Sequence, residues 1–384
     1  MSFDEAIEES LRELAEAGLL RRPPELRRLD PVRVAVDGTP ALLFCSNDYL
    51  GLSDHPALLD ATRRALDEHG LGSGASRLIS GTRTPHRAAE RALAALVRRP
   101  SALLFSTGYA ANLGALSALV GRHDVAFSDR LNHASLIDGL RLARPAVHVY
   151  AHADVDDLAR RLEAHRADGR EALVVTDTVF SMDGDVAPLR RLRALCDRYD
   201  AGLYVDEAHA LGVLGEGRGA CHAASVVPDA LVGTLGKAAG VAGAFVAGSA
   251  SLRTLLENRA RSYVFSTAPP AALAAAAEAA ADLLDAADDR RARVLGYAAT
   301  LRDALRHQGW EVPRGETPIV PVLVGDAERT MALSAALLER GFYVRGIRPP
   351  TVPSGTSRLR VVPTAGHSEA HLRALIDAFA ELGP

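Results

Sequence analysis

The chain has 384 residues, of which 48% are hydrophobic and 24% are charged, and its formal net charge is −4 at pH 7. This length allows one large domain and a smaller one, and the interspersed charges exclude the basic field that nucleic acid or an anionic membrane requires. Cys45, Cys196 and Cys221 lie far apart without a CxxC pair, so neither a disulfide framework nor a metal site is predicted. The composition favours small-molecule chemistry.

The first element in chain order is a predicted helix. Residues 1–22 form an acidic amphipathic pattern without the basic start and apolar run of a signal peptide, which predicts a cytoplasmic protein. We expect residues 1–40 to form an N-terminal helical arm. The alanine-rich segment 269–287 is interrupted by acidic residues, so it is predicted to be a packed helix rather than a membrane span.

Short apolar runs alternate with helical patterns through the middle of the chain. This order predicts an α/β fold with a mainly parallel sheet, in a large domain over residues 41–287. The last two runs are too close together for a crossover helix, so one strand there is predicted to be antiparallel. The predicted strands are 101–108, 125–129, 146–152, 171–179, 201–209, 230–237 and 243–249.

From about residue 288 the pattern starts again as a separate unit. A helical pattern is followed by the apolar run 316–326, a second helix, the extended segment 341–367 and a final helix. We expect residues 288–384 to form a smaller C-terminal α/β domain.

Lys237 is the single lysine of the chain, and the other 43 of its 44 basic residues are arginines. An arginine cannot lose a proton near neutral pH and condense with a carbonyl group, so this lysine is a candidate for such chemistry. Lys237 and Asp206 each end a predicted strand, at the edge where open α/β sheets bind ligands. The pair predicts a pyridoxal phosphate site, with Lys237 forming an imine and Asp206 keeping the pyridine nitrogen protonated. A helix cap or a structural ion pair is the alternative for Asp206 alone.

Two loops after predicted strands complete this interpretation. Ser106, Thr107 and Gly108 lie between a strand and a helix, where backbone amides can receive a phosphate. His133 follows another strand and can stack on a flat heterocycle. An ordinary turn and a structural histidine are the respective alternatives.

Two short motifs are typical of other protein classes, but the residues that those classes require around them are missing. Residues 206–209 spell DEAH, a helicase magnesium box, but the required upstream phosphate loop is missing because Lys237 lies downstream. The glycine-rich stretch 70–82 has Ala75 in place of the third spaced glycine and follows no clear strand, so a dinucleotide loop is not favoured.

In this order the motifs resemble the α-oxoamine synthases, a pyridoxal phosphate group with the aminotransferase type I fold. The resemblance covers nearly the whole chain and implies a pyridoxal-phosphate-dependent transferase. Its motifs are SNDYLGLSDHP (46–56), GSGASRLISGT (72–82), GYAANLGAL (108–116), DRLNHASLIDG (129–139), VFSMDGDVAPL (179–189), VDEAHALGVLGEGRG (205–219), TLGKAAG (234–240) and FSTAPP (265–270).

Members of this family condense an amino acid with an acyl thioester and release carbon dioxide. The resemblance implies that Lys237, Asp206 and His133 are catalytic, and that Thr267 reaches the cofactor of a second subunit in a homodimer. The implied cofactor contacts are Gly108, Tyr109, Ser181, Asp206, His209, Thr234, Lys237 and Thr267. The implied substrate contacts are Arg21, Asn47, His133, Arg348 and Thr351, with Asn47 and Arg348 at the amino-acid carboxylate.

The segment GIRPPTVPSGTSRLR (346–360) is most similar to members that join L-alanine to a pimeloyl thioester in biotin synthesis. Members that use glycine, such as glycine C-acetyltransferase, or serine are the alternative. A cofactor-binding regulatory module fused to a DNA-binding head is disfavoured by the acidic start. Ala238 and Ala239 depart from the family's glycine-rich run after the lysine, as Ala268 and Ala89 depart from its serine and leucine.

Overall fold

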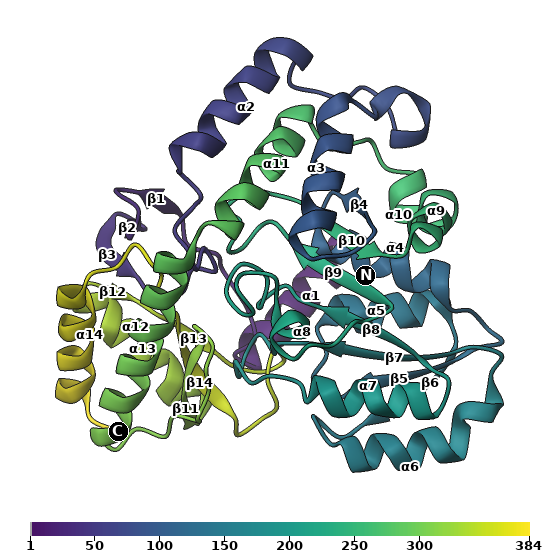
Figure 1. The fold of residues 1–384 in the computed structure, drawn as a ribbon. Helices are drawn as coiled ribbons and strands as arrows, with labels where there is room; N and C mark the ends of the chain where they lie inside the picture. Colours follow the sequence, from purple (N-terminus) through teal and green to yellow (C-terminus); the bar gives the residue numbers. More distant parts are fainter. Residues whose placement is uncertain (1) are drawn as a thin grey trace.

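The structure is a computed structural model that describes residues 2–384, and a seven-stranded sheet forms its centre (Figure 1). The strand order is β4-β10-β9-β8-β7-β5-β6. Only β10 runs antiparallel to its neighbours β4 and β9, so the predicted mainly parallel sheet is confirmed. The strands are β4 (Ser101–Phe105), β5 (Val125–Asp129), β6 (Ala146–Tyr150), β7 (Ala172–Asp177), β8 (Gly202–Asp206), β9 (Ala230–Thr234) and β10 (Ala244–Gly248).

Helices cover both faces of this sheet because its central strands are apolar on both sides; all six residues of β7 are buried. The core on one face includes side chains of α2 (Pro56–His69), α3 (Thr84–Leu96), α6 (Val155–His165), α7 (Leu189–Arg198), the short α8 (Ala220–Ala223) and α11 (Ala271–Asp285). The core on the other face includes α4 (Gly108–Leu119), α5 (Ala134–Ala143), α9 (Ala250–Arg259) and α10 (Arg261–Val264). A single 3-10 turn, η2 (Arg166–Asp168), follows α6.

The C-terminal segment forms its own sheet and core, shown in green and yellow in Figure 1. The sheet order is β11-β14-β13, and the predicted order of helix, strand, helix, extended segment and helix is confirmed. The elements are α12 (Asp288–His307), β11 (Val320–Gly325), α13 (Ala327–Glu339), β12 (Phe342–Tyr343), β13 (Arg345–Ile347), β14 (Ser357–Val361) and α14 (Glu369–Leu382).

The N-terminal region differs from the expected helical arm. It contains one helix, α1 (Phe3–Glu16), followed by the strands β1 (Leu26–Arg28), β2 (Arg33–Val36) and β3 (Thr39–Leu43). These strands form a sheet with β12, because β3 pairs in parallel with Phe342 and Tyr343. Val34, Val36, Ala41 and Tyr343 make the small core that stabilises this pairing. The predicted bounds of the three domains stay predictions.

The predicted alanine-rich helix is α11, which packs against α2 and α3. Among the residues that the structure describes, no helix combines the length and the apolarity that a membrane span needs.

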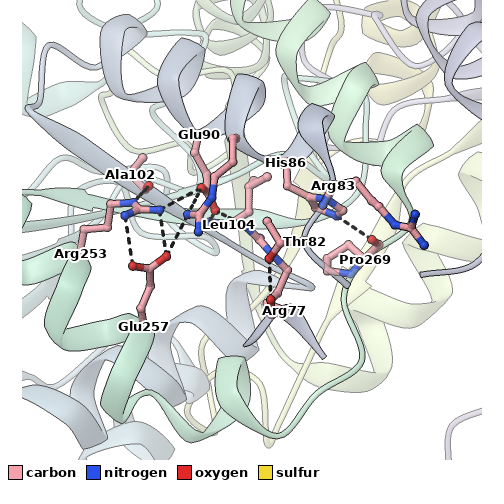
Figure 2. A network of polar contacts seen from close by, with 11 residues as sticks. Arg77, Thr82, Arg83, His86, Glu90, Ala102, Leu104, Arg253, Glu257 and Pro269 are labelled. Atoms are coloured by element: carbon pink, nitrogen blue, oxygen red, sulfur yellow. Dashed lines mark hydrogen bonds and ion pairs between the residues drawn. The ribbon is translucent and has the colours of Figure 1, made fainter. Parts of the chain in front are cut away.

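A buried polar network connects α3 to two other segments, one that contains Arg77 and one that contains Pro269 (Figure 2). His86 on α3 donates from Nε2 to the carbonyl of Pro269, at 2.8 Å. One turn later, Glu90 accepts hydrogen bonds from Arg77 at 2.8 Å and from Arg253 at 3.3 Å. Arg77 begins the π-helical turn η1 (Arg77–Gly81), so α3 fixes both η1 and the segment that follows Thr267.

Among residues 2–384, Glu90 is the only carboxylate paired with the Arg77 guanidinium, and Arg77 is 4% exposed; replacing Glu90 by Ala removes this partner. An uncompensated buried charge is costly, so we expect the free energy of unfolding to fall by about 3 kcal/mol or more. Urea denaturation measures this change. Replacing the exposed Glu163 by Ala is the control, with an expected effect of about 0.5 kcal/mol or less. If Glu90→Ala lowers the free energy of unfolding by less than about 1 kcal/mol, the network does not have the stabilising role given to it.

Candidate functional site

A cavity of about 1040 Å³ lies between the carboxyl ends of the parallel strands and the C-terminal segment. Among the described residues that line it, none is acidic and four are basic, namely Arg130, Lys237, Arg345 and Arg360. Such a surface selects anionic ligands by charge. Of the predicted site residues, those that line the cavity are Asn47, His133, Ser181, His209, Lys237 and Thr351.

Lys237 lies in the connection between β9 and β10, close to the end of β9. Burial is the main cause that lowers the pKa of its amine to about 8, although Asp206 and Asp177 oppose this shift by charge. The Nζ atom lies 2.9 Å from Nε2 of His209. Lys237 is therefore an amine that loses its proton close to neutral pH, as imine chemistry requires.

The backbone around Lys237 is fixed by packing. Ala238 and Ala239, which replace the family's glycines, are 2% and 1% exposed and belong to the core. Gly240 has a φ of 69°, and a Cβ there would lie 2.6 Å from the backbone of Leu52. Only glycine fits this position, so the loop is anchored directly after the reactive lysine.

Asp206 ends β8 and is 4% exposed. Its Oδ1 accepts from the backbone N–H of Ala208 at 2.9 Å, and its Oδ2 accepts from the Asn112 amide at 2.7 Å. These contacts hold the carboxylate at the strand end where the sequence predicts it. Asn112 lies on α4 and was not predicted as a site residue, although it belongs to the motif GYAANLGAL.

His133 caps the N-terminus of α5. Its backbone N–H donates to Asp177, at 2.6 Å, and its Nδ1 lies 2.7 Å from the hydroxyl of Ser135. Desolvation of the ring, assisted by the charge of Lys237, lowers the pKa of His133. The ring is consequently neutral at physiological pH, and His133 lines the cavity.

His209 is held from its far side by Tyr49. The Tyr49 hydroxyl lies 2.6 Å from Nδ1 of His209 and 3.3 Å from Oδ1 of Asn47. Both Tyr49 and His209 are buried, and burial lowers the pKa of His209 well below its usual value. Tyr49 connects Lys237 and His209 to Asn47, and sequence reasoning missed this tyrosine although it lies in the motif SNDYLGLSDHP.

The predicted phosphate contacts gather at the N-terminus of α4. Gly108 begins this helix, and a Cβ on it would lie 3.7 Å from the hydroxyl oxygen of Thr234. Helix N-termini present unpaired N–H groups to anions. The Tyr109 hydroxyl donates to Asp138. Thr267 is exposed and pairs with Ser76, so within one chain it does not reach the cavity; its contact with a second subunit stays a prediction.

Arg348, the predicted carboxylate contact, does not line the cavity, whereas Arg360, which was not predicted, does. Arg348 donates to the carbonyl of Leu20 and does not line the cavity. Arg360 on β14 lines it and donates to the Ser181 carbonyl at 2.6 Å and to Oδ1 of Asn47 at 3.2 Å. Its buried Nη2 has no hydrogen-bond partner in the described chain. Arg360 is therefore the better candidate beside Asn47 for a ligand carboxylate.

The two remaining predicted substrate contacts lie together. The Arg21 guanidinium donates to the Thr351 hydroxyl, at 3.0 Å, and Thr351 lines the cavity. Arg21 thus brings a further cation from the N-terminal region to the cavity wall.

The set of side chains fits pyridoxal phosphate. The fit rests on the lysine with a lowered pKa, the buried carboxylate at a strand end, the helix N-terminus beside Thr234, and the neutral rings of His133 and His209. Each corresponds to one part of that cofactor: aldehyde, pyridine nitrogen, phosphate, ring face and phenolic oxygen.

Comparison with known proteins gives a consistent result. Residues 39–379 match the family described as aminotransferase class I and II. The 8-amino-7-oxononanoate synthase of Geobacter sulfurreducens is 51% identical, over 97% of this chain and 96% of that protein. A serine palmitoyltransferase variant from S. paucimobilis with bound PLP is 31% identical, covers 99% of this chain and 96% of its own, and has a TM-score of 0.92. The 8-amino-7-oxononanoate synthase of Francisella tularensis is 28% identical, covers 89% and 97%, and has a TM-score of 0.77.

The lowered pKa of Lys237 predicts a pH-dependent effect of Lys237→Met on the stability of the cofactor-free protein. Since the folded state binds this proton more weakly than the unfolded chain, the wild type loses stability as the pH falls from 10.5 to about 8, and the loss is complete below about 8. We expect the variant to be more stable by about 1 to 2 kcal/mol at pH 7, after discounting for the partial exposure of the side chain to the cavity. The difference should shrink as the pH rises from about 8 to about 10.5.

Denaturant unfolding at several pH values, with wild type and variant in parallel, checks this. A difference that does not change with pH would contradict a lowered Lys237 pKa.

Proposed function

Because the chain belongs to the aminotransferase class I and II family and, within it, to the α-oxoamine synthases, we propose that it condenses L-alanine with a pimeloyl thioester. The reaction releases carbon dioxide and the thiol and yields 8-amino-7-oxononanoate, a step of biotin biosynthesis. The observation that carries the proposal is Lys237, an amine with a pKa of about 8 in a cavity whose described charged lining residues are all basic. Similarity to 8-amino-7-oxononanoate synthases over nearly the whole chain supports the choice of substrates.

The cofactor of this chemistry is pyridoxal phosphate. When bound, it supplies an electron-withdrawing ring that stabilises negative charge at the α-carbon of the amino acid. Lys237 would hold it covalently, Asp206 would hold the pyridine nitrogen, and His133 would lie against the ring. Gly108, Tyr109, Thr234 and Thr267 would hold the phosphate, and His209 and Ser181 the phenolic oxygen.

Lys237 also has the properties of a general base. A group whose pKa is about 8 keeps an unprotonated fraction at neutral pH, so Nζ can take the α-proton of alanine and return it later. The neutral His209 at 2.9 Å accepts a hydrogen bond from Nζ and orients it. His209 is buried and Lys237 is partly buried, which limits the water around the pair.

The two anionic ends of the substrates have separate cationic partners. Arg360 and Asn47, which are hydrogen-bonded to each other, would bind the alanine carboxylate. Arg21 and Thr351, which are also hydrogen-bonded, lie farther along the cavity wall and would contact the acyl substrate. A planar guanidinium binds a carboxylate through two hydrogen bonds, so each arginine orients its ligand as well as neutralising it.

A homodimer and a cytoplasmic location are part of this proposal. Thr267 lies on the surface of one chain, so a second copy is needed to bring it to a cofactor. The acyl carrier is either coenzyme A or an acyl carrier protein, since both present the same thioester.

A substrate panel tests the proposed function. The purified protein, loaded with pyridoxal phosphate, is given alanine, glycine or serine with a pimeloyl, acetyl or palmitoyl thioester, and the products are identified by mass spectrometry. We expect 8-amino-7-oxononanoate from alanine and the pimeloyl thioester, and loss of turnover by at least about a thousandfold in Lys237→Ala. The proposed substrates are wrong if alanine gives no product while glycine reacts with the acetyl thioester or serine reacts with the palmitoyl thioester.

The two arginines of the C-terminal segment give a matched comparison. Arg360→Gln removes a cavity cation, so we expect the KM for alanine to rise by about a hundredfold. Arg348→Gln removes a cation that lies outside the cavity, and its KM for alanine should stay within about twofold of the wild type. Steady-state kinetics with alanine as the varied substrate measures both values. The reverse order of effects would restore Arg348 as the carboxylate contact.

A further inference from the structure

A buried hydrogen-bond network connects His133 to Asp206. Its members are Asn112 on α4, Ser135 on α5 and Tyr204 on β8, with exposures of 1%, 1% and 0%. The Asn112 amide nitrogen donates to Asp206 at 2.7 Å and to the Ser135 hydroxyl at 2.8 Å. The Tyr204 hydroxyl donates to the Asn112 oxygen at 2.9 Å.

The direction of each hydrogen bond in this network follows from one carboxylate. An ionised carboxylate only accepts, so the Asn112 amide must present its nitrogen to Asp206 and its oxygen to Tyr204. Both protons of that nitrogen are then used, one by Asp206 and one by Ser135. The Ser135 oxygen accepts from Asn112, which leaves its own proton to donate elsewhere.

The only other partner of the Ser135 hydroxyl in the described chain is Nδ1 of His133, at 2.7 Å. The backbone N–H of Ser135 also points to this nitrogen, at 3.3 Å. Nδ1 therefore accepts two hydrogen bonds and carries no proton. A neutral imidazole has one proton, which must then be on Nε2.

Nε2 of His133 has no hydrogen-bond partner within residues 2–384, and His133 lines the cavity. We infer that Asn112 and Ser135 are positioning residues that keep His133 in the Nε2–H form, so that it donates a hydrogen bond to a substrate oxygen. The identity of that oxygen, a carboxylate of alanine or the carbonyl of the thioester, rests on the proposed function. The tautomer itself does not.

The same network positions both His133 and Asp206. Within the described part of the chain, Asn112 is the one side chain that is hydrogen-bonded to both Asp206 and Ser135, the partner of His133. A displacement of the Asn112 amide would move the Asp206 carboxylate and the His133 ring together. In this form Nε2 already carries its proton and Nδ1 is occupied by the two Ser135 donors, so His133 does not act as the base toward a ligand in the resting protein.

The direct test is the tautomer of His133 in the wild-type holoenzyme. Protein labelled with ¹⁵N-histidine, and His133→Asn protein for assignment, gives the ring nitrogen shifts from long-range ¹H–¹⁵N correlations. We expect a protonated Nε2 and an unprotonated Nδ1. A protonated Nδ1 in the wild type would overturn the inference without any need for a variant of the network.

Ser135→Ala then tests the hydroxyl. It removes the shorter of the two donors to Nδ1, so we expect the Nδ1–H form to become detectable and the Kd of L-alanine, followed by cofactor absorbance, to rise about tenfold. Ser135→Thr restores a hydroxyl and should restore both values. Ser117→Ala is the matched control, because the Ser117 hydroxyl on α4 donates to the carbonyl of Leu113 and contacts neither His133 nor Asp206.

An unchanged tautomer and an unchanged Kd in Ser135→Ala would contradict the positioning role. If alanine gives no absorbance change while the wild type shows the Nε2–H form, the proposed substrate is wrong and the positioning role stands.

Discussion

The arrangement of this molecule depends on keeping a lysine amine and two carboxylates out of water at one edge of a parallel sheet. Asp177 and Asp206 end the neighbouring strands β7 and β8, and Lys237 follows β9. Burial raises the pKa of Asp177 and lowers that of Lys237, so both groups move toward their neutral forms. The helices on both faces of the sheet supply the burial that makes these shifts possible.

Neutral histidines complete this environment because they fill the cavity wall without adding charge. His133 and His209 are held from behind, by Ser135 and Tyr49 respectively, and each leaves its other ring nitrogen for the cavity or for Lys237. The arginines of the cavity lie on other elements. In the proposed function, proton transfer would therefore take place at the sheet edge, and carboxylate binding at the C-terminal segment.

The strands, the antiparallel β10 and the pairing of Lys237 with Asp206 could be predicted, because apolar runs and strand ends follow from local sequence. The short strands β1 to β3 could not, since β12, which completes their sheet, lies about 300 residues away in the chain. Tyr49 contacts His209, which is 160 positions away, and Asn112 contacts Asp206, which is 94 positions away; no spacing rule reveals such partners. Arg348 and Arg360 lie in one motif, and only the fold shows which of them faces the cavity. The roles assigned to the individual site residues stay predictions.

The pairing of β3 with β12 has a consequence for synthesis on the ribosome. Phe342 and Tyr343 are synthesised only after the strands of the central sheet, so β3 cannot pair with its parallel neighbour until then. Asn47 likewise meets Arg360 only at this late stage. Lys237 and Asp206 are therefore made before Arg360, and the pair of Asn47 and Arg360 can form only after β14 has been synthesised.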